Sequence, residues 1–93
     1  MNNAEAREVL ARHLLHYRTL SYDELVCRQG CVETAELTAA SGRTYQIEVQ
    51  FFWSDRAGGA ILVLGSVDDG GWRAFCPLTE DFIVGPEGQR VGE

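Results

Sequence analysis

The sequence contains no lysine, so all eight of its basic side chains belong to arginine. Schiff-base chemistry, a phosphate-loop lysine and a lysine general base are therefore excluded. The basic residues are outnumbered by 14 acidic ones, which gives a net charge of −6 and a pI near 4.8. Nucleic acids and anionic membranes attract positively charged surfaces, so we expect neither as a partner.

Long apolar runs are also missing. The longest, residues 60–64, has five residues, whereas a membrane-spanning helix needs about 18 or more. The N-terminus is polar and partly acidic and does not resemble a secretory signal. The three cysteines, Cys27, Cys31 and Cys76, form an odd set, which favours reduced thiols over a disulfide framework. We therefore expect a cytoplasmic protein.

The first 30 residues predict two helices. Apolar side chains recur at helical spacing between residues 3 and 20, namely Ala6, Val9, Leu10, His13, Leu14, Tyr17 and Leu20. Ser21 and Glu24 then have the spacing of a capping box, which predicts a short helix over residues 22–28. Gly30 is suited to end it in the left-handed conformation.

After Gly30 the apolar pattern alternates with a period of two, which predicts strands. We expect them over residues 32–40, 44–53, 60–67 and 72–78, with the third in the centre because it is apolar on both faces. Asp69 and Gly70 favour a tight hairpin turn, which would pair Val67 with Trp72 and Leu64 with Phe75.

The expected fold is α+β: an N-terminal helix and a short capped helix packed on one face of a four-stranded antiparallel β-meander. We predict a single domain over residues 1–93, with helices in 1–30, the sheet in 31–79 and a partly ordered tail in 80–93. One helical layer leaves the second sheet face open. We predict that Phe52, Phe75, Leu62 and Leu64 form an interface there, since a contiguous apolar patch marks a partner or ligand surface.

Three segments resemble a family of small uncharacterised bacterial proteins with a domain of unknown function. They are residues 45–55 (YQIEVQFFWSD), residues 65–78 (GSVDDGGWRAF, then PL) and residues 20–25 (LSYDEL), so the likeness extends over most of the chain. The resemblance implies a helix-plus-sheet fold, and it implies no activity and no catalytic residues.

Four side chains have ligand types suited to tetrahedral zinc: His13, His16, Cys27 and Cys31. Against a metal site, His13 belongs to the apolar stripe of its helix, and the two cysteines lie on either side of the helix end at Gly30. We therefore predict no metal and no cofactor and keep these residues as weak candidates. No spacing in the sequence combines a nucleophile, a base and an orienting group, so we predict that the protein is not an enzyme.

Charge is distributed unevenly along the chain. Residues 1–30 hold four arginines and four acids, whereas residues 31–93 hold four arginines and ten acids, so the excess belongs to the sheet and tail. We predict a non-enzymatic protein-interaction module that forms a homodimer through its open sheet face. The alternatives are a small-ligand or zinc-binding protein, or an acidic, toxin-neutralising protein of the immunity type that binds a basic partner.

Overall fold

The computed structural model describes residues 3–69, 78–87 and 90–91. Helix α1 spans Asn3–Arg18, and every apolar residue of its buried stripe lies three or four positions from the next: Ala6, Leu10, Leu14 and Tyr17. These side chains are at most 4% exposed and form one side of the hydrophobic core. The helix predicted from apolar spacing is thus confirmed, and it ends two residues earlier than expected.

Helix α2, Tyr22–Cys27, begins with the predicted capping box. The Glu24 amide donates to Ser21 Oγ at 3.1 Å, and the Ser21 amide donates to Glu24 Oε2 at 2.9 Å. Both bonds satisfy amides that a helix start leaves without a partner. The chain leaves α2 through Gly30, which has the expected left-handed backbone with φ of +81°.

The strands form one antiparallel sheet in the order β1-β2-β3-β4-β5. Their bounds are Val32–Thr38 for β1, Thr44–Trp53 for β2, Ile61–Asp68 for β3, Leu78–Val84 for β4 and Arg90–Val91 for β5. The strand predicted to be central, β3, lies between β2 and β4. The predicted α+β fold with an antiparallel meander is confirmed, and the two-residue β5 adds a fifth strand.

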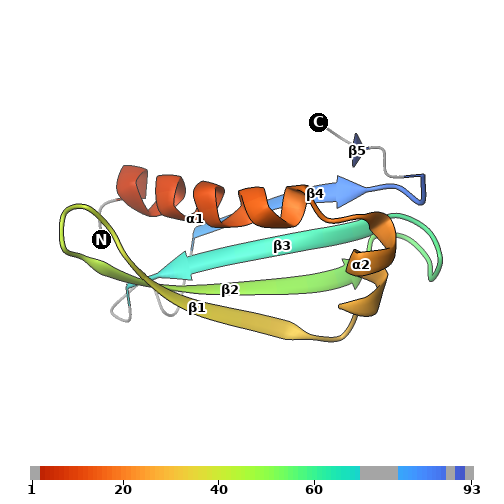
Figure 1. Cartoon of the computed structure of the whole chain (residues 1–93), viewed down its shortest axis with the longest axis horizontal. Helices are drawn as coiled ribbons and strands as arrows, with labels where there is room; N and C mark the ends of the chain where they lie inside the picture. The colour runs from red at the N-terminus through yellow and green to blue at the C-terminus, as the bar shows by residue number, and fades with distance from the viewer. Residues whose placement is uncertain (1–2, 70–77, 88–89, 92–93) are drawn as a thin grey trace.

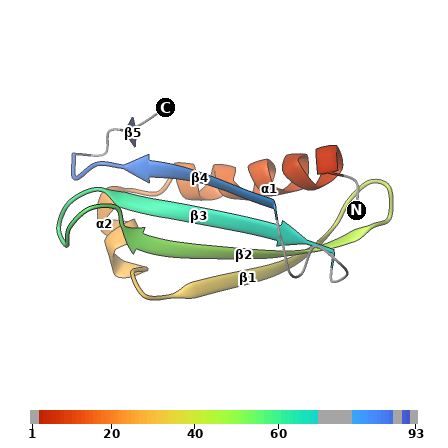
Figure 2. The same cartoon turned by 180° about the vertical axis from the view of Figure 1, so that it is seen from behind.

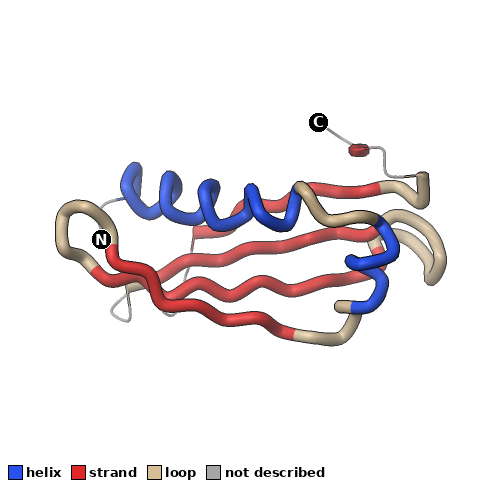
Figure 3. The backbone as a smooth tube through the Cα atoms, in the orientation of Figure 1, coloured by secondary structure: helices blue, strands red, loops and turns tan. Residues whose placement is uncertain are grey.

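Both helices lie on the same face of the sheet. They stand in front of the strands in Figure 1 and behind them in Figure 2, and Figure 3 shows the two layers along the backbone. The odd-numbered residues of β2 and β3 point toward the helices and are buried, except for the half-buried Trp53, as the two-residue alternation predicts. Helix α1 packs on β3 and β4, and α2 packs on β3.

The fourth strand is not where the sequence predicted it. Val67 pairs with Leu78, so the predicted pairing of Val67 with Trp72 is wrong, as is that of Leu64 with Phe75, because Leu64 pairs with Asp81. The predicted strand over residues 72–77 lies outside the described residues. Residues 80–84, which we assigned to a partly ordered tail, continue β4, and Phe82 is buried in the core at 2% exposure.

Neither described helix is long and apolar enough to cross a membrane.

Candidate functional site

The sheet face opposite the helices carries an apolar cluster, which we call the open-face cluster. The register places Phe52, Leu62 and Ile83 side by side in one row across β2, β3 and β4. The neighbouring row contributes Val32 from β1 and Leu64 from β3. Phe52 is 43% exposed and Val32 is 54% exposed. Large apolar side chains gathered on one uncovered face are typical of a docking surface.

The other end of this open face is acidic. Glu36, Glu48 and Asp68 come from three neighbouring strands, and Gln46 donates to Glu36 Oε2 at 2.7 Å. Within the described strands, no basic residue shares this face. The open face therefore has an apolar half, which also holds Asp81 of β4 opposite Leu64, and an acidic half.

Three of the four predicted interface residues lie in the open-face cluster: Phe52, Leu62 and Leu64. Phe75 lies outside the described residues. The sequence reasoning did not select Val32 or Ile83. Ile83 could have been found from its alternation with Phe82 and Val84 if those residues had been interpreted as a strand. Val32 could be assigned to this face only from its pairing with Gln50 in the β1–β2 register.

The structure does not bring the four weak zinc candidates together. The rings of His13 and His16 both contact Tyr17 edge-on, with centroids 5.7 and 5.3 Å from its ring. Cys27 and Cys31 are exposed free thiols. In the described ranges, no three His, Cys, Asp or Glu side chains gather where they could hold one ion.

A polar clasp joins both helical segments to the sheet. Tyr17 of α1 donates to Glu33 Oε1 at 2.7 Å, and Arg28, just after α2, bonds the other oxygen of the same carboxylate. Burial and the hydrogen bond to Glu33 raise the pKa of Tyr17 to about 12. Burial acts to raise the pKa of Glu33, but the bonds from Tyr17 and Arg28 outweigh it and lower that pKa. The three groups stabilise one another, which is a structural role.

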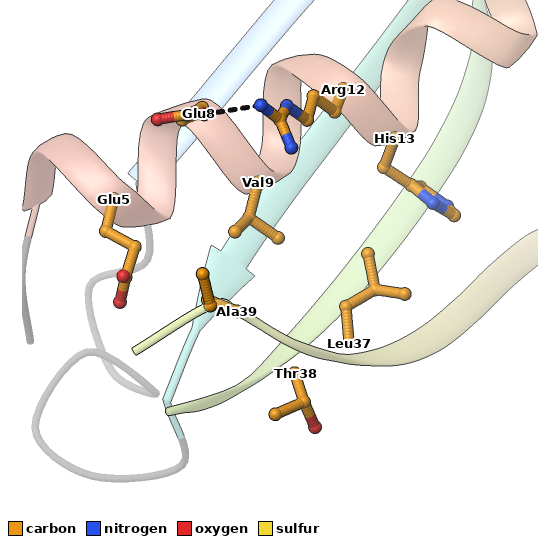
Figure 4. Close-up of a pocket in the computed structure, with 9 residues that line it drawn as sticks. Glu5, Glu8, Val9, Arg12, His13, Leu37, Thr38 and Ala39 are labelled. Atoms are coloured by element: carbon orange, nitrogen blue, oxygen red, sulfur yellow. Dashed lines mark ion pairs between the residues drawn. The ribbon is translucent and has the colours of Figure 1, made fainter. Parts of the chain in front are cut away.

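A groove of about 470 Å³ lies between α1 and the edge strand β1. Figure 4 shows Val9 of the helix directed toward Leu37 and Ala39 across the gap, with Glu8 and Arg12 paired on the outer side of the helix at 2.8 Å. The groove lies beside the first half of α1, because the helix packs mainly on β3 and β4 and not on the end of β1. Its volume lies within the usual range for ligand sites, and sequence periodicity gave no sign of it.

Two of the side chains that line the groove, Glu5 and His13, have lowered pKa values. Glu5 accepts hydrogen bonds from Ser41 and Tyr45, both at 2.8 Å, and these bonds lower the pKa of its carboxyl. Burial, followed by the charge of His16, lowers the pKa of His13, while Glu33 acts in the opposite direction. Glu5 therefore fastens the start of α1 to the β1–β2 turn and keeps its negative charge beside the groove.

No protein-family model, curated protein or solved structure matches this chain.

Proposed function

We propose that this chain is a non-enzymatic protein-interaction module that forms a homodimer through its open sheet face. The observation that carries the proposal is the open-face cluster of Val32, Phe52, Leu62, Leu64 and Ile83. Burying apolar side chains is the main driving force of protein association. Phe52 is the expected anchor, because large aromatic side chains contribute most to such interfaces.

The division of the open face supports a second copy as the occupant. A two-fold axis through the open-face cluster would place apolar halves against each other with the strands antiparallel. The acidic halves, with Glu36, Glu48 and Asp68, would then extend in opposite directions, and Asp81, opposite Leu64, would be the one acidic side chain of the described strands beside the apolar contact. Sheets that pack in this way form a sandwich with the helices outermost.

The size of the open-face cluster predicts a weak dimer. A standard stable interface uses about 20–30 residues on each side, and the open-face cluster has only five apolar members. We therefore expect a dimer that forms in the high micromolar range and strengthens with salt, which screens the repulsion between two chains of net charge −6. A cytoplasmic location remains part of this proposal.

Sedimentation equilibrium from about 10 µM to 1 mM tests the dimer. We expect the apparent mass to rise from 10.3 kDa toward twice that value, and Phe52→Glu to weaken the association at least tenfold. Leu15→Glu is the matched control, because Leu15 is 58% exposed on α1, away from the open face. A monomer at every concentration, or equal effects of the two variants, would refute the proposal.

A further inference from the structure

Strand β1 is an edge strand that carries two carboxylates, Glu33 and Glu36, and no basic residue. It forms the end of the sheet and pairs only with β2 in the described part of the chain. Proteins often protect such edges with lysine, proline or a bulge. The seven residues of β1, VETAELT, contain neither lysine nor proline, and their register with β2 is continuous over all seven pairs.

The hydrogen bonding of the β1–β2 turn identifies which backbone groups face outward. The Ala39 amide donates to the Arg43 carbonyl at 2.8 Å, in line with the β1–β2 register. In an antiparallel pair the bonded residues alternate, so Ala35 and Leu37 are bonded to β2. The amides and carbonyls of Thr34 and Glu36 therefore point away from the sheet, where another strand could bind them.

The groove along α1 lies beside this edge, on the helix side of β1. Leu37 and Ala39 direct their side chains into it, opposite Val9 of the helix (Figure 4). An added strand would place every second side chain in this groove and the others beside the open face. The groove has a volume of about 470 Å³, and apolar side chains from both walls line it in part. It can therefore accept small aliphatic side chains.

The charges around the edge select the occupant. Arg12 pairs with Glu8, and Arg28 pairs with Glu33, so these four charges offset one another. The carboxylate of Glu36, on β1, accepts a hydrogen bond from Gln46 and lies near Glu48 on the acidic half of the open face. A second copy would bring the same acidic strand to the edge, in a chain of net charge −6, whereas a cationic strand would complement it.

We propose that β1 and the groove beside it form a second binding site, which takes an extended cationic segment of a partner protein as an additional β-strand. The segment alternates small aliphatic side chains, which enter the groove, with lysine or arginine, which lie near Glu36. Main-chain hydrogen bonds to Thr34 and Glu36 provide affinity, and the alternating side chains provide selectivity. This site is separate from the open-face cluster that we propose for the homodimer.

The test uses the full chain and the synthetic peptide acetyl-KVRVKVR-amide as the probe. We expect saturable binding by calorimetry, and at least tenfold weaker binding of acetyl-KRKRVVV-amide, which has similar charge without the alternation. In hydrogen exchange, the amides of Thr34 and Glu36 should become at least tenfold more protected, while those of Ala35 and Leu37 change little. Equal binding of the two peptides, or unchanged exchange at Thr34 and Glu36, would overturn the proposal.

Two further peptides test the main-chain bonds without altering the protein. One is N-methylated on the amides of its cationic residues and the other on the amides of its valines. Only alternate amides of an added strand face β1, so one of these peptides should lose binding and the other should retain it. Equal loss or equal retention would contradict strand addition. The Phe52→Glu variant, in which the homodimer should be weakened, should bind the probe as the parent chain does. The result for this site therefore does not depend on whether the homodimer forms.

Discussion

Gly65 of β3 lies directly beneath α1, and we expect its replacement by alanine to destabilise the fold. A Cβ atom at this position would lie 2.9 Å from Leu10 Cδ1 and 3.0 and 3.1 Å from the two δ-carbons of Leu14. Carbon atoms in contact normally stay about 3.5–4.0 Å apart. Both leucines are at most 1% exposed, so their methyl groups have little free space into which to move.

The magnitude follows from two opposing effects. Overpacking a core by one methyl group typically costs about 1–3 kcal/mol. Alanine in a strand regains about 0.5–1 kcal/mol, because glycine loses more backbone entropy on folding. We therefore expect Gly65→Ala to lower the free energy of unfolding by about 1–2 kcal/mol, which for a chain of this size shifts Tm by about 4–16 °C.

Urea unfolding of four chains would test this reasoning: the parent, Gly65→Ala, Leu14→Ala and the double variant. Leu14→Ala alone should cost about 2–5 kcal/mol, but it removes two of the three δ-carbons that crowd the new methyl group. Gly65→Ala should therefore cost clearly less in that background, where only Leu10 Cδ1 still lies too close. Ser66→Ala, on the opposite face of β3, should change stability by less than about 0.5 kcal/mol. An equal cost of Gly65→Ala in both backgrounds would refute the steric explanation.

Three other predictions concern the cap, the clasp and the thiols. Ser21→Ala should lower the free energy of unfolding by about 1 kcal/mol, and urea titration measures it; no change would show that the capping box is dispensable. The pKa of Glu33 lies below 4.5 in the folded chain and that of Tyr17 rises from 10.0 to about 12. Stability should therefore fall below about pH 4.5 and again between about pH 10 and 12. Glu33→Gln should reduce the loss of stability at acid pH, and Tyr17→Phe should reduce the loss of stability at alkaline pH. Unchanged pH profiles in these variants would contradict the clasp. EDTA should leave Tm unchanged, whereas a drop that zinc reverses would revive a metal role for Cys27 and Cys31.

The sequence was most informative where structure depends on neighbouring residues. The capping box at Ser21 and the left-handed backbone of Gly30 follow from local hydrogen bonding and sterics, so they could be predicted. Alternation identified the buried face of β2 because Tyr45 and Phe51 lie on one side of a pleated strand.

The fourth strand was misplaced for the opposite reason. Asp69 and Gly70 provide a strong local turn signal, but the partner of β3 is decided by burial of Phe82 and Val84, which are distant in sequence from the surfaces that cover them. Glu80 and Asp81 also make β4 look like a solvent-exposed tail, although Asp81 lies in the sheet opposite Leu64. The groove could not be predicted either, because it depends on where α1 crosses the sheet.

The packing of α1 on β3 and β4 has a consequence for the order of events during synthesis. The ribosome makes Leu10 and Leu14 first, yet their contacts with Gly65 become possible only about 50 residues later. At typical elongation rates that delay is about 3–10 s. During this time the apolar stripe of α1 has no sheet to cover it. The nascent chain should therefore be most prone to aggregation, or most dependent on a chaperone, before β3 has been synthesised.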